Sequence, residues 1–162
     1  MTTKTETKTV HVNRVYIKAP PEAVWEAITK PEWTEKYGYQ APVEYDLRPG
    51  GTFRAFPSDA MKAHEGTPDV LIEGEVIEVD PPRKLVQTWR ALWEPVEGVT
   101  RLTWELREHD GGVTVLTVTH ELDGAPNTAA MVAGEIENAG GGWSEILSDL
   151  KTLLETGKRL YS

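Results

Sequence analysis

Four histidines, His11, His64, His109 and His120, are the residues of this sequence that most readily bind a metal ion or transfer a proton near neutral pH. They are scattered along the chain, and none belongs to the His-Glu-x-x-His motif that places two metal ligands on one helix face. The chain contains no cysteine, so neither a thiolate nucleophile nor a cysteine ligand is available. We therefore predict no metal site and no cofactor.

Nucleophilic and phosphoryl-transfer chemistry also lack their motifs. The sequence has no Gly-x-Ser-x-Gly turn, no Walker loop, and no Gly-x-Gly-x-x-Gly after a strand. Three glycines at 140–142 precede the last predicted helix, but they follow no strand and are not accompanied by a lysine. We expect these glycines to form a flexible start of that helix rather than a phosphate site.

Acid–base chemistry would need polar side chains inside the domain, and three are candidates. His120 alternates in phase with apolar neighbours, so its imidazole points inward, either as a hydrogen-bonded core group or as a polar contact for a ligand. Gln87 is in phase with Trp89 and places an amide on the same inner face. Glu135 precedes the last helix, where an exposed acidic residue is ordinary. The three form no recognised triad, so no catalytic residue is predicted.

Hydrophobic periodicity predicts the elements that position these side chains. Alternation with a period of two, bounded by glycine and proline turns, indicates antiparallel strands at residues 10–17, 43–47, 52–57, 72–77, 85–90, 102–107 and 115–120. Two short helices are expected at 21–29 and from residue 31, each started by a proline. Residues 58–69 are polar and without periodicity, which is typical of a long functional loop.

The strongest pattern lies near the C-terminus. A helical apolar stripe of about three turns ends before Gly157 and comprises Trp143, Ile146, Leu147, Leu150, Leu153 and Leu154. Because strands and helices do not alternate along the chain, the fold class is α+β rather than a parallel α/β sheet.

Size and charge restrict the remaining possibilities. The 162 residues suit one domain, which we assign to 9–160, and the polar segment 1–8 is predicted to be a disordered tail. A formal charge of −9 without a basic stripe argues against nucleic-acid binding. No segment has the length and apolarity of a membrane span or a signal peptide, so a cytoplasmic protein is expected. The pattern leaves the oligomeric state open.

Four stretches, at residues 17–25, 48–54, 74–89 and 142–143, resemble motifs of the SRPBCC (START/Bet v 1-like) superfamily, in its activator of Hsp90 ATPase homologue 1-like branch. The first reads Ile-Lys-Ala-Pro-Pro-Glu-Ala-Val-Trp, and the second reads Arg-Pro-Gly-Gly-Thr-Phe-Arg. The resemblance covers nearly all of residues 9–159. It implies a helix-grip fold, in which a curved antiparallel sheet of about seven strands holds the C-terminal helix around an apolar cavity.

Six tryptophans in this chain are a high number, and large aromatic side chains serve either as core or as cavity wall. In a helix-grip fold the two layers coincide. The predicted cavity residues are Trp33, Tyr37, Phe53, Gln87, Trp89, Trp104, His120, Met131, Trp143 and Leu147.

Three functions follow from this resemblance. We favour binding of a small hydrophobic molecule (a lipid, a polyketide or an aromatic metabolite) without turnover, in stress response or self-resistance. A cyclase or dehydratase acting on an aromatic or polyketide substrate is the second hypothesis. A chaperone-associated role is the third; the Hsp90 activators resembled carry a further N-terminal domain that this sequence does not show, so we do not transfer their role by name.

Overall fold

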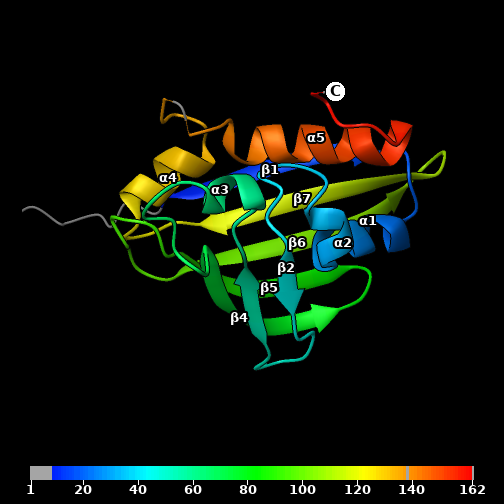
Figure 1. Cartoon of the computed structure of the whole chain (residues 1–162). Coiled ribbons are helices and arrows are strands. Elements are labelled where there is room, and N and C mark those ends of the chain that lie inside the picture. The colour runs from blue at the N-terminus through cyan, green and yellow to red at the C-terminus, as the bar shows by residue number, and fades with distance from the viewer. Residues whose placement is uncertain (1–8, 138, 162) are drawn as a thin grey trace, which may run out of the picture.

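The computed structural model describes residues 9–137 and 139–161, so the predicted tail at 1–8 lies outside the described residues. These described residues form seven strands and five helices (Figure 1). In order they are β1 (Val10–Ile17), α1 (Pro21–Thr29), α2 (Pro31–Thr34), β2 (Val43–Tyr45), β3 (Thr52–Ala55), α3 (Asp59–Lys62), β4 (Ile72–Asp80), β5 (Lys84–Ala91), β6 (Thr100–His109), β7 (Val113–Glu121), α4 (Pro126–Val132) and α5 (Gly142–Thr156).

All neighbouring strands are antiparallel, and the sheet order is β1-β7-β6-β5-β4-β3-β2. The sheet curves, and α5 lies across its concave side while α1 and α2 pack at one end (Figure 1). The predicted α+β helix-grip class is confirmed. The first strand therefore pairs with the last, and β1 and β2 are the two edges of the sheet.

Prolines and a glycine set the helix limits, as expected for α1, α2 and α5. Pro21, Pro31 and Pro126 begin α1, α2 and α4, where the N–H that proline lacks would have no helical acceptor. Helix α5 ends at Gly157, whose φ of 78° is left-handed and whose N–H donates to the Leu153 carbonyl.

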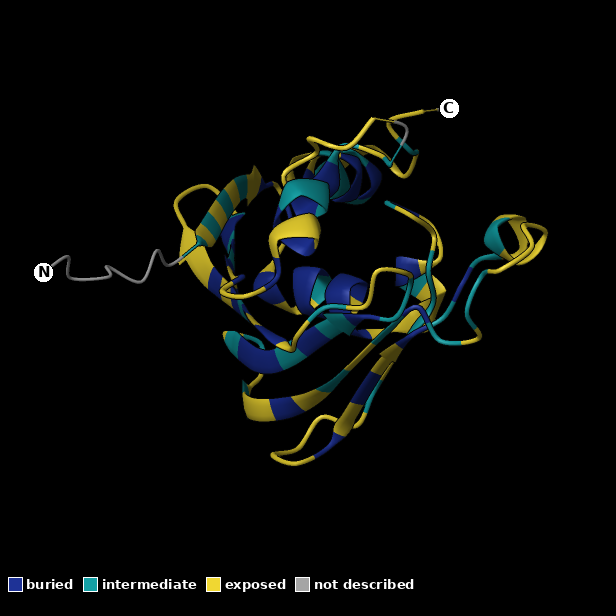
Figure 2. Cartoon of the chain, turned by 90° about the vertical axis from the view of Figure 1, so that its left-hand side faces the viewer, coloured by how far each residue is buried: buried dark blue, intermediate teal, exposed yellow. Residues whose placement is uncertain are grey.

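Alternation along the strands divides inner from outer residues. On β6, Leu102, Trp104 and Leu106 are buried, and Arg101, Glu105 and Arg107 between and beside them are exposed. Figure 2 shows this alternation as bands of buried and exposed residues along the strands. The core and the region beneath α5 are thus one layer.

The edge strand β1 is held by α5. The Lys151 ammonium donates to the Tyr16 carbonyl at 2.5 Å, and the Glu155 carboxylate accepts the Lys18 N–H at 2.8 Å. These contacts occupy backbone groups that an edge strand would otherwise present for pairing with another chain. They also fix the C-terminal half of α5 against the sheet.

Three local features differ from the prediction. The segment predicted as loop at 58–69 contains the short helix α3, which Ser58 caps by accepting the Met61 N–H. Helix α4 was not predicted, because its seven residues carry too short an apolar repeat. The glycines at 140–142 lie in a close contact that no pattern predicted: a Cβ on Gly140 would lie 2.6 Å from the Tyr39 hydroxyl, and one on Gly142 would lie 2.1 Å from the Val132 carbonyl.

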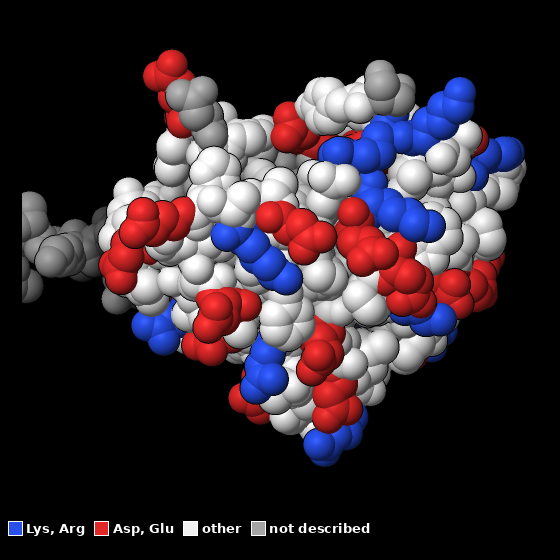
Figure 3. Space-filling view, in the orientation of Figure 1, with Lys and Arg blue, Asp and Glu red and all other residues white. Residues whose placement is uncertain are grey.

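Both acidic and basic side chains cover the face shown in Figure 3, and several of the basic ones lie next to one another at its upper right. Within residues 9–137 and 139–161, no helix is long and apolar enough to cross a membrane.

Candidate functional site

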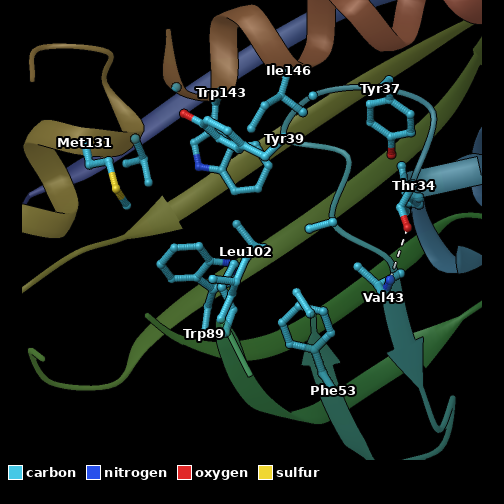
Figure 4. Close-up of a pocket in the computed structure, with 18 of the residues that line it drawn as sticks. Thr34, Tyr37, Tyr39, Val43, Phe53, Trp89, Leu102, Met131, Trp143 and Ile146 are labelled. Atoms are coloured by element: carbon cyan, nitrogen blue, oxygen red, sulfur yellow. Dashed lines mark hydrogen bonds between the residues drawn. The ribbon is translucent and has the colours of Figure 1, made fainter. Parts of the chain in front are cut away.

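A cavity of about 320 Å³ lies between the concave face of the sheet and α5. Met131, Trp143 and Ile146 border it on the side of α4 and α5, and Trp89, Leu102 and Phe53 border it on the side of the sheet (Figure 4). The other lining residues are Ile28, Thr34, Tyr37, Gly38, Tyr39, Ala41, Val43, Tyr45, Ala55, Met61, Leu71, Ile72, Trp93, Trp104, Val132, Ala139 and Gly142. The tryptophans therefore leave a void, instead of filling the region beneath the helix completely.

Six of the ten residues predicted to form the cavity lie in its wall. They come from the α2–β2 segment, three strands and the last two helices, and they are Tyr37, Phe53, Trp89, Trp104, Met131 and Trp143. Segments distant in sequence thus converge on one space.

The other four predicted residues, Trp33, Gln87, His120 and Leu147, lie outside the lining. Trp33 is half-buried, and its ring lies 4.9 Å from the Lys36 ammonium. Leu147 is buried in the core because it follows Ile146 by one position, a rotation of roughly 100° about the helix axis. Gln87 and His120 are fully buried behind the wall.

Every hydroxyl group in the wall already has a partner in the protein. Tyr37 donates to the Ala27 carbonyl at 2.7 Å and Tyr39 to the Ala139 carbonyl at 2.9 Å. Tyr45 donates to Gln87 at 2.5 Å. Thr34 accepts the Val43 N–H at 3.1 Å, the bond drawn in Figure 4. No Asp, Glu, Lys, Arg or His side chain is among the described lining residues, so the wall is electrically neutral and apolar.

Gln87 is the acceptor for two aromatic residues of the wall. Its Oε1 atom accepts the Tyr45 hydroxyl at 2.5 Å and the Trp104 indole N–H at 3.2 Å. Its Nε2 atom donates to the Thr88 carbonyl at 3.3 Å. Burial raises the pKa of Tyr45, as does the nearby Tyr37, and the hydroxyl remains a neutral donor.

His120 forms a second buried network. Its Nδ1 atom accepts the Trp143 indole N–H at 3.1 Å. Its Nε2 atom lies 2.8 Å from the Thr100 hydroxyl, which donates to the Trp89 carbonyl at 2.6 Å. Nδ1 accepts the indole proton, and the Thr100 hydroxyl gives its own proton to Trp89, so the imidazole proton lies on Nε2 and is donated to the Thr100 oxygen.

Burial lowers the pKa of His120 to about 3, with a smaller contribution from His11, its cross-strand neighbour on β1. The imidazole is neutral near pH 7 and both of its nitrogens are engaged. Of the two alternatives left open by the sequence, the structure places His120 as a hydrogen-bonded core group.

The candidates for acid–base chemistry do not come together. Glu135 is exposed beyond the end of α4, whereas Gln87 and His120 are buried behind different parts of the wall. In the described part of the chain, no group of three or more His, Asp or Glu side chains is placed to hold a metal ion. The arrangement can enclose an apolar molecule, and it offers no acid–base pair in the lining.

Two carboxylates fix the segments around the cavity. Glu97, in the β5–β6 connection, accepts the Thr128 and Asn127 N–H groups at the start of α4, at 2.6 and 3.1 Å, and the Thr128 hydroxyl at 2.8 Å. Asp149, fully buried on α5, accepts the Gly38 N–H at 2.9 Å and an Arg159 guanidinium N–H at 2.6 Å. Trp93, Met131 and Gly38 belong to the segments held in this way and line the cavity.

The predicted set of cavity residues omitted several wall residues, among them Tyr45 and Ile146. Ile146 belongs to the predicted apolar stripe of α5 and was identifiable from that pattern. Tyr45 lies on β2, at the opposite edge of the sheet from β1, and reaches Gln87 on β5 only because the sheet curves. Alternation along a strand carries no information about that curvature.

The curved sheet, the C-terminal helix packed across it and the apolar cavity between them together define a helix-grip protein. Residues 18–155 match the family described as activator of Hsp90 ATPase homolog 1-like protein, and the chain belongs to that family. No curated protein matches the chain.

Solved structures share the fold. CalU16 from Micromonospora echinospora is 22% identical, with a TM-score of 0.64 over 93% of this chain and 78% of its own. DynU16, described as a putative protein in the dynemicin biosynthetic locus, is 25% identical, with a TM-score of 0.66 over 93% of this chain; the match spans 48% of DynU16, about half its length. An HSP90 activator from Plasmodium falciparum is 22% identical, with a TM-score of 0.56 over 94% of this chain and 91% of its own.

Proposed function

We propose that this protein binds a small, uncharged hydrophobic molecule in the cavity between the sheet and α5, without chemical turnover. The observation that carries the proposal is the wall: a void of about 320 Å³ whose described lining has no charged residue and whose hydroxyl groups are already hydrogen-bonded within the protein. A charged ligand would lose its hydration there without gaining a partner.

The size of the cavity supports a compact ligand. Ligand pockets usually measure about 300 to 1,000 Å³, and this one is at the lower end of that range. Four tryptophans and three tyrosines among the lining residues present flat aromatic surface. A fused-ring aromatic metabolite, a polyketide of similar size or a short acyl chain suits such a space better than a large diacyl lipid.

One further observation supports binding over catalysis, and one comparison supports the choice of the first ligands to test. His120 is neutral near pH 7 and fully hydrogen-bonded, so it has no free nitrogen to serve as a base toward a ligand. The similar protein DynU16 is described as belonging to a biosynthetic locus, which supports a natural product as the kind of molecule to test first.

The experiment is native mass spectrometry of the purified protein, combined with thermal shift against a panel of neutral polycyclic aromatics, polyketides and fatty acids. We expect neutral ring compounds to be retained one per chain and to raise the Tm, and matched compounds carrying a carboxylate or sulfonate on the ring to bind at least tenfold more weakly. The absence of both a bound species and any Tm shift would overturn the proposal.

A chaperone-associated role is the second candidate, because the family takes its description from an activator of Hsp90 ATPase. It predicts that the protein binds Hsp90 in a pull-down and raises its ATPase rate. An unchanged rate together with no capture at micromolar concentration would dispose of this candidate and leave the binding proposal intact.

A further inference from the structure

Two polar side-chain ends in the cavity wall are turned toward Gln87. Tyr45 and Trp104 both line the cavity, yet the Tyr45 hydroxyl and the Trp104 indole N–H both donate to Gln87 Oε1, at 2.5 and 3.2 Å. Gln87 itself is fully buried and is not a lining residue. One amide oxygen therefore holds the two donors that this part of the wall contains.

We propose that Gln87 sets the ligand specificity of the cavity: by holding the polar ends of Tyr45 and Trp104, it makes the site select a ligand whose buried end is hydrocarbon and carries no hydrogen-bonding group. This inference rests on the proposed binding function and adds a determinant of specificity to it. Gln87 acts through its two neighbours and is a positioning residue.

The arrangement depends on a contact across the concave face. Gln87 lies on β5, whereas Tyr45 lies on β2, three positions away in the sheet order. The Tyr45 ring also packs against Phe53 with the ring centroids 4.6 Å apart, which limits the directions available to its hydroxyl. Trp104 is held in turn by an edge-to-face contact with Trp143 on α5, at 5.4 Å. Each donor is therefore directed by its ring packing and retained by the Gln87 oxygen.

Removal of that oxygen changes the chemistry of the wall. A buried donor without a partner is costly, and the two rings that carry these donors line an open space from which a ligand can supply an acceptor once the donors are freed from Gln87. In Gln87→Leu, the hydroxyl and the indole N–H gain a partner only when a ligand brings one. The variant is therefore expected to favour a ligand that carries an oxygen atom at this end.

The probes are fluorene and 9-fluorenone, which have the same three-ring skeleton and differ by one ketone. Their dissociation constants are measured by tryptophan fluorescence titration for the wild type, Gln87→Leu and Gln87→Glu. The quantity compared is the ratio of the two affinities within one protein, which does not depend on the fraction of folded protein. A merely structural role of Gln87 would lower both affinities and leave the ratio unchanged.

We expect the wild type to bind fluorene at least as tightly as fluorenone, and Gln87→Leu to shift the ratio about tenfold toward fluorenone. Gln87→Glu keeps an oxygen acceptor at the same place and should keep the wild-type ratio. If Gln87→Leu does not fold, Gln87→Met, which has the length of glutamine, is tested for the same shift.

Ratios within twofold of each other in all the folded variants would overturn the inference while leaving the binding function in place. Failure of the wild type to bind either probe would instead remove the proposed function for aromatic ligands, and this inference with it.

Discussion

The indole N–H of Trp143 donates to Nδ1 of His120 across 3.1 Å, joining the first turn of α5 to strand β7. The bond requires an unprotonated Nδ1, because a proton there would face the indole proton. The contact that holds the start of α5 to the sheet therefore depends on the protonation state of one buried histidine.

The first prediction concerns pH. The pKa of His120 is lowered to about 3 in the folded protein, against an ordinary value of about 6.5 once unfolded, so the unfolded chain binds the extra proton between these values. The contribution of neutral His120 to the free energy of unfolding is fully present above about pH 6.5. It decreases as the pH falls, by about 2 kcal/mol at pH 5. Urea unfolding at pH 5 to 7.5 measures the slope. His120→Gln should be less stable at pH 7.5 but should show a flatter slope; an equal slope in both proteins would contradict the account.

The second prediction concerns the buried carboxylate of Asp149. Asp149→Ala leaves the Gly38 N–H and the Arg159 guanidinium without this acceptor, and we expect a loss of about 3 kcal/mol in the free energy of unfolding. Glu26→Ala is the matched control, since it breaks the exposed pair with Lys30 and should change stability by less than about 0.5 kcal/mol. Equal losses in the free energy of unfolding would contradict the expectation that the buried pair stabilises the fold more than the exposed pair does.

The third prediction concerns the start of α4. Helix α4 has no capping side chain of its own at Ala125, and Glu97 from the β5–β6 connection supplies the acceptors instead. Glu97→Ala should lower the free energy of unfolding by about 1 kcal/mol, the usual effect of losing an N-cap. Glu135→Ala removes the same charge beyond the other end of α4 and should not destabilise the protein. Chemical denaturation of both variants decides whether the capping contact, rather than charge alone, is responsible.

The sequence predicted the elements more completely than the site. The stripe beginning at Trp143 and the alternation around Trp104 each specify which face is buried, and burial of one face is the dominant favourable term in folding. Alternation also turned Gln87 and His120 inward correctly. It could not show that both lie behind the wall, because the period of a strand specifies a face and not a depth.

The remaining differences have similar causes. Tyr45 approaches Gln87 through the curvature of a whole sheet, which no local pattern records. His11 and His120 are distant in sequence but lie opposite each other in the β1–β7 register. That register depends on the pairing of the first strand with the last. The close approach of Tyr39 to Gly140 and of Val132 to Gly142 joins segments distant in sequence, and no local pattern records it.

The central claim, that the space beneath α5 receives a ligand, is tested most directly by filling it from the helix. Ile146 lines the cavity and Ser148, two residues further along α5, is exposed, so Ile146→Trp and Ser148→Trp add the same side chain inside and outside. Fluorene binding is titrated for both variants and the wild type, with the Tm as the check on folding. We predict that Ser148→Trp binds like the wild type and that folded Ile146→Trp binds at least about tenfold more weakly. Equal affinity in Ile146→Trp and Ser148→Trp would contradict the account.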